Sequence, residues 1–169
     1  MSQLHSEEQL LRSESLSLKS LVPEYGIGDC YPASVMGWSR WLDALLEGDD
    51  PECYWRAFDQ LMYCQGWYLR RWSDGAIDGF PHGFLIDTTA AADGQPCIID
   101  PIHLLYGTRH EAFWLPVQTM SWPQLDRWFE STSTVKAWPL TTRLGGNELE
   151  DRLSYKRAFT NALTALEVC

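Results

Sequence analysis

A glycine-containing turn that leads into an amphipathic helix pattern is the feature that most constrains the fold of this chain. Residues 25–34 read YGIGDCYPAS, and Cys30 stands directly before a segment whose apolar residues recur at helical spacing. Those apolar positions are residues 31, 35, 38, 42, 45 and 46, which share one face of a helix. Pro32 suits the first turn, because the N–H that proline lacks has no helical partner there. The sequence therefore predicts a helix over 31–47 that begins right after Cys30.

The segments after this helix alternate between helix and strand patterns. The sequence predicts a second helix, which starts at Asp50-Pro51 and is closed by Gly66. Its apolar face is formed by Tyr54, Phe58, Leu61 and Met62. Four strands are then expected, at residues 67–72, 81–87, 97–100 and 112–119, with a loop at 73–80 and Pro116 marking an edge or an end. Helix patterns return after Ser121 and over 147–168. This order predicts an α+β fold, in which N-terminal helices pack on an antiparallel β-sheet and a C-terminal helix follows.

Length and composition indicate one ordinary globular domain. The 169 residues are 45% hydrophobic and 21% charged, which is enough to bury a core without disulfides. We expect an N-terminal arm over 1–22 and a single domain over 23–169. No apolar run reaches the roughly 20 residues that span a bilayer, and the N-terminus lacks the pattern of a secretion signal. The expected setting is cytoplasmic, without membrane contact.

Charge and cysteine content narrow the classes of partner. The net charge of −10 argues against nucleic-acid binding, which depends on neutralising phosphates. The acidic groups predict a solvated surface, or alternatively a decoy that covers a basic partner. Five cysteines without a CxxC pair indicate reduced thiols. The spacing of possible ligands predicts neither a metal site nor a cofactor.

Cys30 is the first candidate for chemistry. A cysteine attacks as its thiolate, and the positive end of a helix favours that charged form. The neighbouring glycines let backbone N–H groups approach a developing oxyanion. The alternative reading is a small buried cysteine with a packing role, which is common for this residue type.

His82 and Asp100 complete a possible triad. His82 opens a predicted strand after a glycine-containing loop, where its ring can act as a base toward Cys30. Asp100 ends the next strand and is followed by Pro101. In a hairpin of these two strands, residue 82 lies opposite the far end of the second strand, which favours Asp100 as the partner of the imidazole. Asp87 lies beside the turn and is the less favoured alternative.

The ordered motifs resemble a known superfamily. Four segments are similar to the corresponding segments of small bacterial and phage proteins with a papain-like or transglutaminase-like core. They are GDCYPAS at 28–34, YCQGWY at 63–68, HGF at 82–84 and IIDP at 98–101. The resemblance covers residues 24–120. It implies that Cys30 is the nucleophile, His82 the general base and Asp100 the orienting acid.

The same resemblance implies further roles and one departure. Gly28, Tyr31, Trp67 and Phe84 are expected to bind substrate. Papain-like peptidases carry a glutamine six residues before the cysteine as an oxyanion donor, whereas Glu24 stands there in this chain. An ionised carboxylate would repel an oxyanion, so we expect backbone N–H groups or another side chain to stabilise it.

Three functions are consistent with these residues. The first is a thiol-dependent amidohydrolase or acyltransferase that acts on an amide of a protein or peptide through a thioester. The second is a non-catalytic acidic binder or inhibitor of the phage or mobile-element type on the same fold. The third is a carbohydrate or peptidoglycan binder that uses Trp67, Trp72 and Trp114 as stacking platforms.

Overall fold

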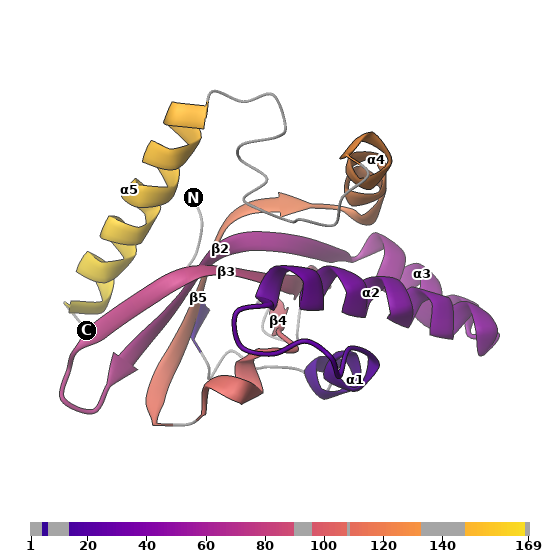
Figure 1. The fold of residues 1–169 in the computed structure, drawn as a ribbon, viewed down its shortest axis with the longest axis horizontal. Helices are drawn as coiled ribbons and strands as arrows, with labels where there is room; N and C mark the ends of the chain where they lie inside the picture. The colour runs from indigo at the N-terminus through magenta and orange to yellow at the C-terminus, as the bar shows by residue number, and fades with distance from the viewer. Residues whose placement is uncertain (1–4, 7–13, 90–95, 108, 133–147, 168–169) are drawn as a thin grey trace.

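The computed structural model describes residues 5–6, 14–89, 96–107, 109–132 and 148–167. Its helices and strands, in chain order, are β1 (His5–Ser6), α1 (Glu14–Leu21), α2 (Cys30–Glu47), α3 (Pro51–Asp59), β2 (Leu61–Trp72), β3 (Ile77–Asp87), β4 (Cys97–Ile99), the 3₁₀ helix η2 (His103–Tyr106), β5 (His110–Met120), α4 (Trp122–Thr132) and α5 (Glu148–Glu167). Figure 1 shows an α+β arrangement, as the sequence predicts. No helix in the described part of the chain is long and apolar enough to cross a bilayer.

One antiparallel sheet organises the described part of the chain. Its strand order is β1-β5-β2-β3-β4, so β5 lies beside β2 although β3 and β4 come between them in sequence. The long β2–β3 hairpin pairs Leu61 with Asp87 at one end and Arg71 with Ile77 at the other. The sheet curls as it crosses the molecule (Figure 1).

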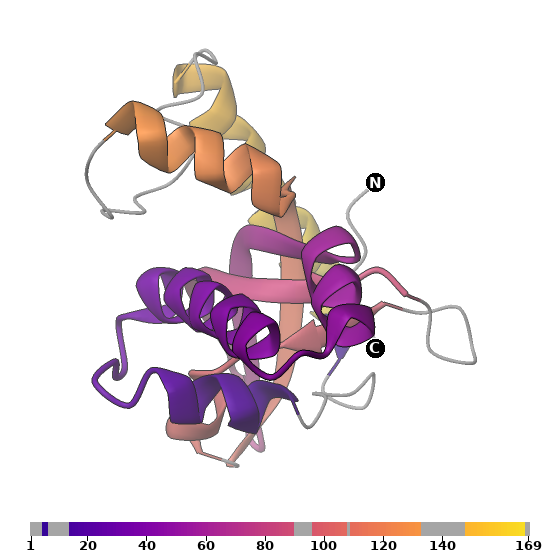
Figure 2. The same cartoon turned by 90° about the vertical axis from the view of Figure 1, so that its right-hand side faces the viewer.

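Helices cover one face of the sheet in two halves. In the first half, Tyr63 of β2 and Leu85 of β3 pack with Trp38 of α2. In the second half, Leu69 of β2 packs with Leu166 of α5. Figure 2 shows α1, α2 and α3 grouped together. α4 (Trp122–Thr132) joins the first half, because the Trp122 ring lies 5.0 Å from that of Trp38.

The opposite face of the sheet carries a second buried cluster. Strand residues alternate between faces, so Cys64 and Tyr68 point away from the α2 side. They pack with Phe84 and Trp114, and the half-buried Tyr106 of η2 lies against the same cluster. The candidate site lies next to this second cluster.

The helix that begins at Cys30 follows the predicted bounds closely. It runs from Cys30 to Glu47, with Pro32 in its first turn and Gly48 at its end. Leu18 of α1 and Val22 are fully buried, and α1 packs on α2. The guanidinium of Arg40 donates to the carbonyl of Leu21 at 2.7 Å, which ties the two helices together.

The second predicted helix is too long, and that part of the prediction is wrong. α3 begins at Pro51 as expected, and the Asp50 side chain accepts from the backbone N–H of Cys53 at 3.1 Å. It ends at Asp59, and residues from Leu61 onward form β2. Pairing with β3 and β5 satisfies the backbone of this segment, and this tertiary context overrides its helical spacing.

One smaller prediction about the strands is also wrong. The expected loop at 73–80 is a shorter turn, because β3 already begins at Ile77. Pro116 lies inside β5, but at a point where β1, which pairs only with Phe113 and Trp114, leaves that side of β5 open among the described residues. Its missing N–H is accommodated at an irregularity, where the register shifts between Gln65 and Gly66. Gly66 is required there, because a Cβ would come within 1.9 Å of the Leu115 carbonyl oxygen.

Candidate thiol site

The site lies at an edge of β3 that no strand covers among the described residues. β4 pairs with β3 only from Leu85 to Asp87, so His82 lies beyond the end of β4. The first turn of α2 packs at this edge. A Cβ on Gly83 would come within 2.7 Å of Tyr31 Cδ1, and the Ser34 hydroxyl donates to the Gly83 carbonyl at 3.0 Å. A glycine next to His82 therefore lets the start of α2 approach the strand.

Four N–H groups hold the carboxylate of Asp100. Its Oδ1 accepts from the backbone N–H groups of Ile102 at 3.0 Å and His103 at 3.1 Å. Its Oδ2 accepts from the Trp114 indole at 2.9 Å and lies 2.7 Å from His82 Nε2. Burial raises the pKa of Asp100, but the charge and hydrogen bond of His82, with smaller contributions from Trp114 and His103, outweigh it and lower that pKa. The carboxylate is thus kept ionised and in a fixed orientation.

His82 is fully buried between Asp100 and Cys30. Burial lowers the pKa of the imidazole, but the charge and hydrogen bond of Asp100, followed by the hydrogen bonding and charge of Cys30, raise it to about 10. Nε2 is the atom that faces Asp100. Nδ1 is buried and makes no well-formed hydrogen bond to a described residue. The thiol is therefore close to the ring but not tightly bonded to it, as catalytic pairs often are before substrate binds.

Cys30 is the first residue of α2 and is 4% exposed. Its sulfur lies close to two tyrosines as well as to His82. The pKa values of Tyr31 and Tyr106 are raised, mainly by burial and then by the charge of Cys30. A thiolate at this position would therefore lie at the start of a helix, where the macrodipole favours negative charge.

Two backbone N–H groups next to the sulfur are available to a ligand. The first N–H groups of an α-helix have no acceptor within the helix. Pro32 has no N–H, and the N–H of Ala33 donates to the Asp29 carbonyl at 2.9 Å. The N–H groups of Cys30 and Tyr31, the first two of α2, donate in no hydrogen bond found among the described residues.

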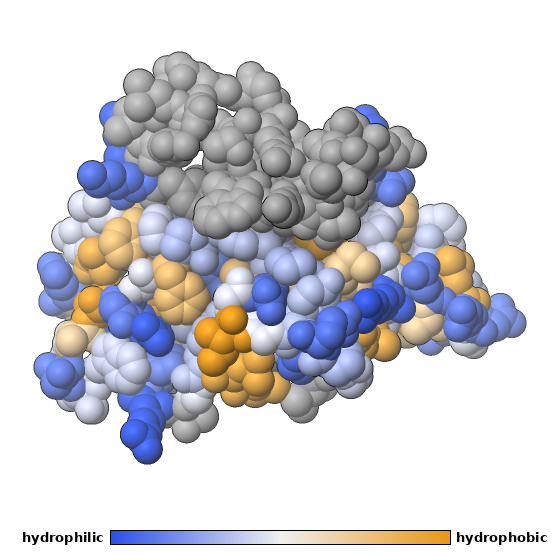
Figure 3. Space-filling model, viewed as in Figure 1, coloured by the Kyte–Doolittle hydropathy of each residue, from blue (hydrophilic) through white to orange (hydrophobic). Residues whose placement is uncertain are grey.

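Aromatic rings surround the imidazole and cover the site. The His82 ring lies 5.9 Å from Phe80 and 5.8 Å from Tyr106, both half-buried. The exposed apolar side chains of Ile27, Leu104 and Leu105 come from the two segments that flank Cys30 and Asp100. Figure 3 shows an apolar patch over the loop before α2 and over η2. The closed site therefore borders an apolar surface.

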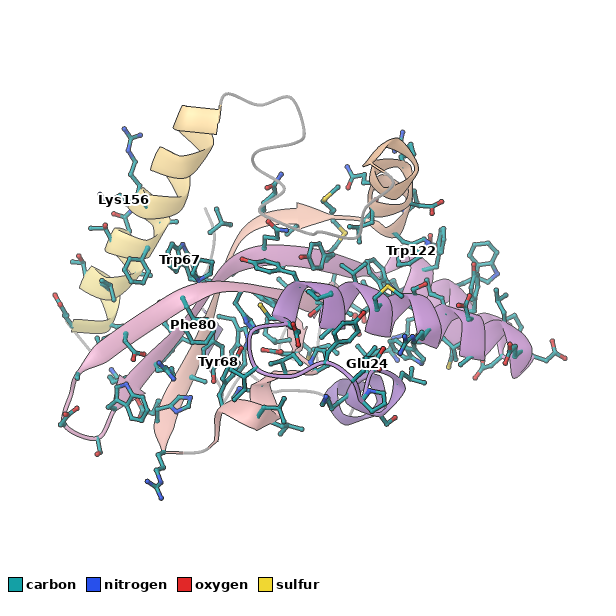
Figure 4. The ribbon with its side chains drawn as sticks, viewed as in Figure 1. Glu24, Trp67, Tyr68, Phe80, Trp122 and Lys156 are labelled. Carbon is teal, nitrogen blue, oxygen red and sulfur yellow. The ribbon has the colours of Figure 1, made fainter. Side chains whose placement is uncertain are left out.

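The residues expected to bind substrate have different locations. Gly28 is exposed, with a φ of 97° in the loop before Cys30, and Tyr31 is half-buried beside Gly83. Phe84 is fully buried and stacks 6.1 Å from the His82 ring, so it supports the ring from inside the core. Trp67 does not reach the site: it packs 4.4 Å from Phe159 of α5 (Figure 4). The prediction that Trp67 and Phe84 face a substrate is therefore wrong, because both pack within the fold.

Glu24 is not directed at the thiol. Its carboxylate pairs with Arg40 at 2.7 Å, and Figure 4 shows it near the end of α1. The hydrogen bond and charge of that guanidinium lower the pKa of Glu24. The carboxylate is neutralised by a guanidinium that lies ten residues after Cys30 along α2, which weakens the objection that the sequence raised.

Asp87 and Trp114 have structural roles that the sequence left open. Asp87 accepts from Arg56 at 2.7 Å and does not contact His82. Trp114 is 1% exposed and donates its indole N–H to Asp100, so it is not a platform for a carbohydrate ring. Sequence reasoning missed this indole donor, because β5 reaches Asp100 only through the non-sequential strand order.

Other chemical groups of the described residues add no second centre of this kind. No cluster of three or more histidine, cysteine or acidic side chains that could hold a metal ion occurs among them. Cys53, Cys64 and Cys97 are free thiols like Cys30, and burial raises the pKa of Cys64. Comparisons of the chain with models of known protein families, with curated proteins and with solved structures gave no match.

Proposed function

We propose that this chain is a thiol-dependent amidohydrolase or acyltransferase with a papain-like or transglutaminase-like core, and that it acts on an amide of a protein or peptide. The observation that carries the proposal is the arrangement of Cys30, His82 and Asp100. A carboxylate with four N–H donors faces a fully buried imidazole, and the thiol at the start of a helix interacts with the same ring. This is the order of groups that nucleophilic catalysis by a cysteine requires.

The first step is attack by the Cys30 thiolate on the amide carbonyl carbon. His82, with its Nε2 proton directed at Asp100, holds the second proton on Nδ1 beside the sulfur. The C–S bond forms while the carbonyl electron pair moves onto oxygen. The N–H groups of Cys30 and Tyr31 donate to that oxyanion, and the helix dipole stabilises it further.

The second step expels the amine. The oxyanion electron pair reforms the carbonyl, the C–N bond breaks, and His82 Nδ1 gives its proton to the leaving nitrogen. The acyl group remains on Cys30 as a thioester. Water or a primary amine then attacks this thioester, His82 removes the proton from the attacking group, and the thiolate leaves. Asp100 keeps the imidazole oriented through both steps.

The surroundings of the site support a protein or peptide substrate. Cys30 is 4% exposed, so Tyr31 or Tyr106, which pack against its cluster, must move aside before an amide can reach the sulfur. The exposed Ile27, Leu104 and Leu105 border this entrance. Apolar side chains flanking the scissile amide would bury themselves against this surface, at about 25 cal/mol per Å² of apolar area removed from water.

A product assay tests the proposal. The protein is incubated with an extract of the producing cell and with a peptide digest of it, with and without a biotinylated primary amine. Mass spectrometry then measures amide cleavage, deamidation and amine incorporation. We expect products from the wild type and from Cys64→Ala, a matched loss of another buried thiol, and none from Cys30→Ala. Equal products from Cys30→Ala would contradict the assignment.

The second candidate, a non-catalytic acidic binder, is favoured by a different surface. The far end of α2 and the adjoining α3 expose Leu46 at 60% and Trp55 at 58%. Exposed acidic side chains accompany them: Asp43, Glu47, Asp49, Asp50, Glu52 and Asp59. A partner for this surface would be basic and partly apolar. If this function holds instead, Cys30→Ala retains every binding partner and no Cys30-dependent product forms.

A further inference from the structure

A tyrosine between two histidines lies directly behind the triad. The hydroxyl of Tyr68 is 3.0 Å from Nδ1 of His103 and 3.0 Å from Nε2 of His110. Tyr68 is fully buried, and the two histidines are 4% and 8% exposed. Figure 4 shows Tyr68 on the sheet near Phe80, below the start of α2. None of these three side chains has a role in the steps above.

The hydroxyl fixes both rings. It has a single proton, so it can donate to one imidazole only and must accept from an N–H of the other. At least one of the two facing nitrogens, Nδ1 of His103 or Nε2 of His110, therefore carries a proton. Such a buried pairing favours one fixed geometry, because rotating either ring breaks its hydrogen bond to the hydroxyl.

This network is connected to the carboxylate of the triad. His103 contributes its backbone N–H to Asp100 Oδ1 at 3.1 Å while its side chain contacts Tyr68. The His103 ring also lies 4.9 Å from the Trp114 ring, whose N–H donates to Asp100 Oδ2. Tyr68 thus contacts both His103 and Trp114, which supply two of the four N–H donors to Asp100.

The phenol ring also contacts the imidazole of the triad. The Tyr68 ring lies 5.3 Å from His82, 5.0 Å from Tyr106 and 5.4 Å from Trp114. Among the described residues, the titratable groups around the phenol include His82 from β3, His103 and Tyr106 from η2, His110 from β5 and Cys64 from β2. Arg70 is separated from the ring by Phe80, over which its guanidinium stacks at 5.3 Å.

We propose that Tyr68 is a positioning residue of the proposed thiol site, and that its hydroxyl, held on one side by His110, acts through His103 to keep Asp100 oriented toward His82. The inference rests on the proposed function for its meaning, since a charged His82 matters because it favours the thiolate of Cys30. Tyr68 acts only through other residues and touches neither substrate nor sulfur.

The decisive variant is Tyr68→Phe, which keeps the ring and removes only the hydroxyl. We expect the alkylation rate of Cys30 near pH 6 to fall about tenfold, with a smaller loss near pH 8, because the rate follows the thiolate fraction. Histidine ring nitrogen NMR should show that His82 loses its second proton at lower pH than in the wild type. If Tyr68 had a purely structural role, the variant would unfold at a lower temperature, but the pH dependence of Cys30 alkylation and the titration of His82 would not change.

The matched control is Tyr63→Phe. Tyr63 is also fully buried on β2, and its hydroxyl accepts from Gln65 Nε2 at 3.2 Å on the other face of the sheet. We expect this variant to keep the wild-type pH profile of Cys30 alkylation. A conservative rescue uses His103, where asparagine can present an amide near the position of Nδ1. His103→Asn should retain the profile that His103→Ala loses.

The outcomes separate this inference from the proposed function. If wild-type Cys30 is unreactive and His82 is neutral near pH 7, the proposed function fails. If Cys30 is reactive and Tyr68→Phe has the wild-type profiles, the positioning role is overturned and the triad assignment stands. If Tyr63→Phe shifts the profiles as much as Tyr68→Phe, the effect is not specific to the network, and the inference is also wrong.

Discussion

Nε2 of His82 lies 2.7 Å from Oδ2 of Asp100, and neither side chain is exposed to solvent. Burying two opposite charges is favourable only when good geometry and further hydrogen bonds offset the loss of hydration. Asp100 meets this condition through its other N–H donors. His82 meets it only in part, because Nδ1 has no well-formed hydrogen bond to a described residue. Because Nδ1 of His82 is incompletely paired and lies beside the Cys30 thiol, we assign His82 a chemical role and not a purely structural one.

Replacing the carboxylate of the pair should neutralise His82. Asp100→Asn removes the charge that raises the pKa of His82, so the imidazole loses its second proton near neutral pH. We expect slower alkylation of Cys30 and a loss of about 3–5 kcal/mol in the free energy of unfolding, as for other broken buried pairs. Urea unfolding and thiol labelling measure the two effects.

Asp87→Asn is the matched control for that variant. Asp87 is also fully buried, but its partner is Arg56. We expect lower stability with an unchanged rate of Cys30 alkylation. A slowdown equal to that of Asp100→Asn would show that general loosening, and not the His82 partner, controls the thiol.

The pH dependence of stability should report the charged imidazole. The pKa of His82 is raised from 6.5 to about 10. The charged His82 therefore contributes its full stabilisation of the folded protein below the pKa that His82 has in the unfolded state. This contribution is lost as the pH rises through the pKa of His82 in the folded state. The difference in unfolding free energy between wild type and His82→Gln should shrink between about pH 7 and pH 10. A constant difference across this range would mean that His82 is neutral in the folded protein.

The sequence allowed the core of the site to be predicted, but not its support. The spacing of apolar residues predicted α2 and put Cys30 at its start, because helical periodicity is a local property. The hairpin argument favoured Asp100 over Asp87 because strand direction constrains which ends meet, and His82 indeed contacts Asp100. Both inferences needed only neighbouring elements.

The rest depends on contacts between distant segments. Leu61 and Met62 fit a helical face as well as a strand, and only pairing with β3 and β5 decides between them. Trp114 reaches Asp100, and His110 reaches Tyr68, because β5 lies beside β2, out of sequence order. No local pattern indicates that order, so the indole donor and the hydroxyl between two histidines could not be predicted.

The glycine next to His82 should be intolerant of a side chain. A Cβ at residue 83 would come within 2.7 Å of Tyr31 Cδ1 and 3.0 Å of Tyr31 Cα, so the start of α2 would have to shift. Gly83→Ala should therefore cost about 1–3 kcal/mol in stability and slow Cys30 alkylation, since overpacking moves the thiol from the ring. Thermal unfolding and labelling check this, with Gly26→Ala as the control, where the nearest atom to a Cβ is 4.0 Å away. Equal effects in the two variants would contradict the contact.

Glu24 should be dispensable for the reactivity of the thiol. Its carboxylate pairs with Arg40 and its side chain is 47% exposed, so solvent screens the pair and the pair adds little to stability. Glu24→Gln should change the rate of Cys30 alkylation by less than about twofold, because a partly exposed pair is well screened by solvent. A large acceleration would indicate that Glu24 faces the oxyanion position after all.

The most direct test of the central claim compares two thiols of opposite exposure. Cys30 is buried and Cys53 is exposed, so accessibility alone predicts that Cys53 is alkylated first. If His82 activates Cys30, peptide mapping after brief iodoacetamide treatment near pH 7 should show Cys30 labelled at least about tenfold faster than Cys53, and His82→Ala should reverse the order. Faster labelling of Cys53 in the wild type, with no effect of His82→Ala on Cys30, would contradict the account.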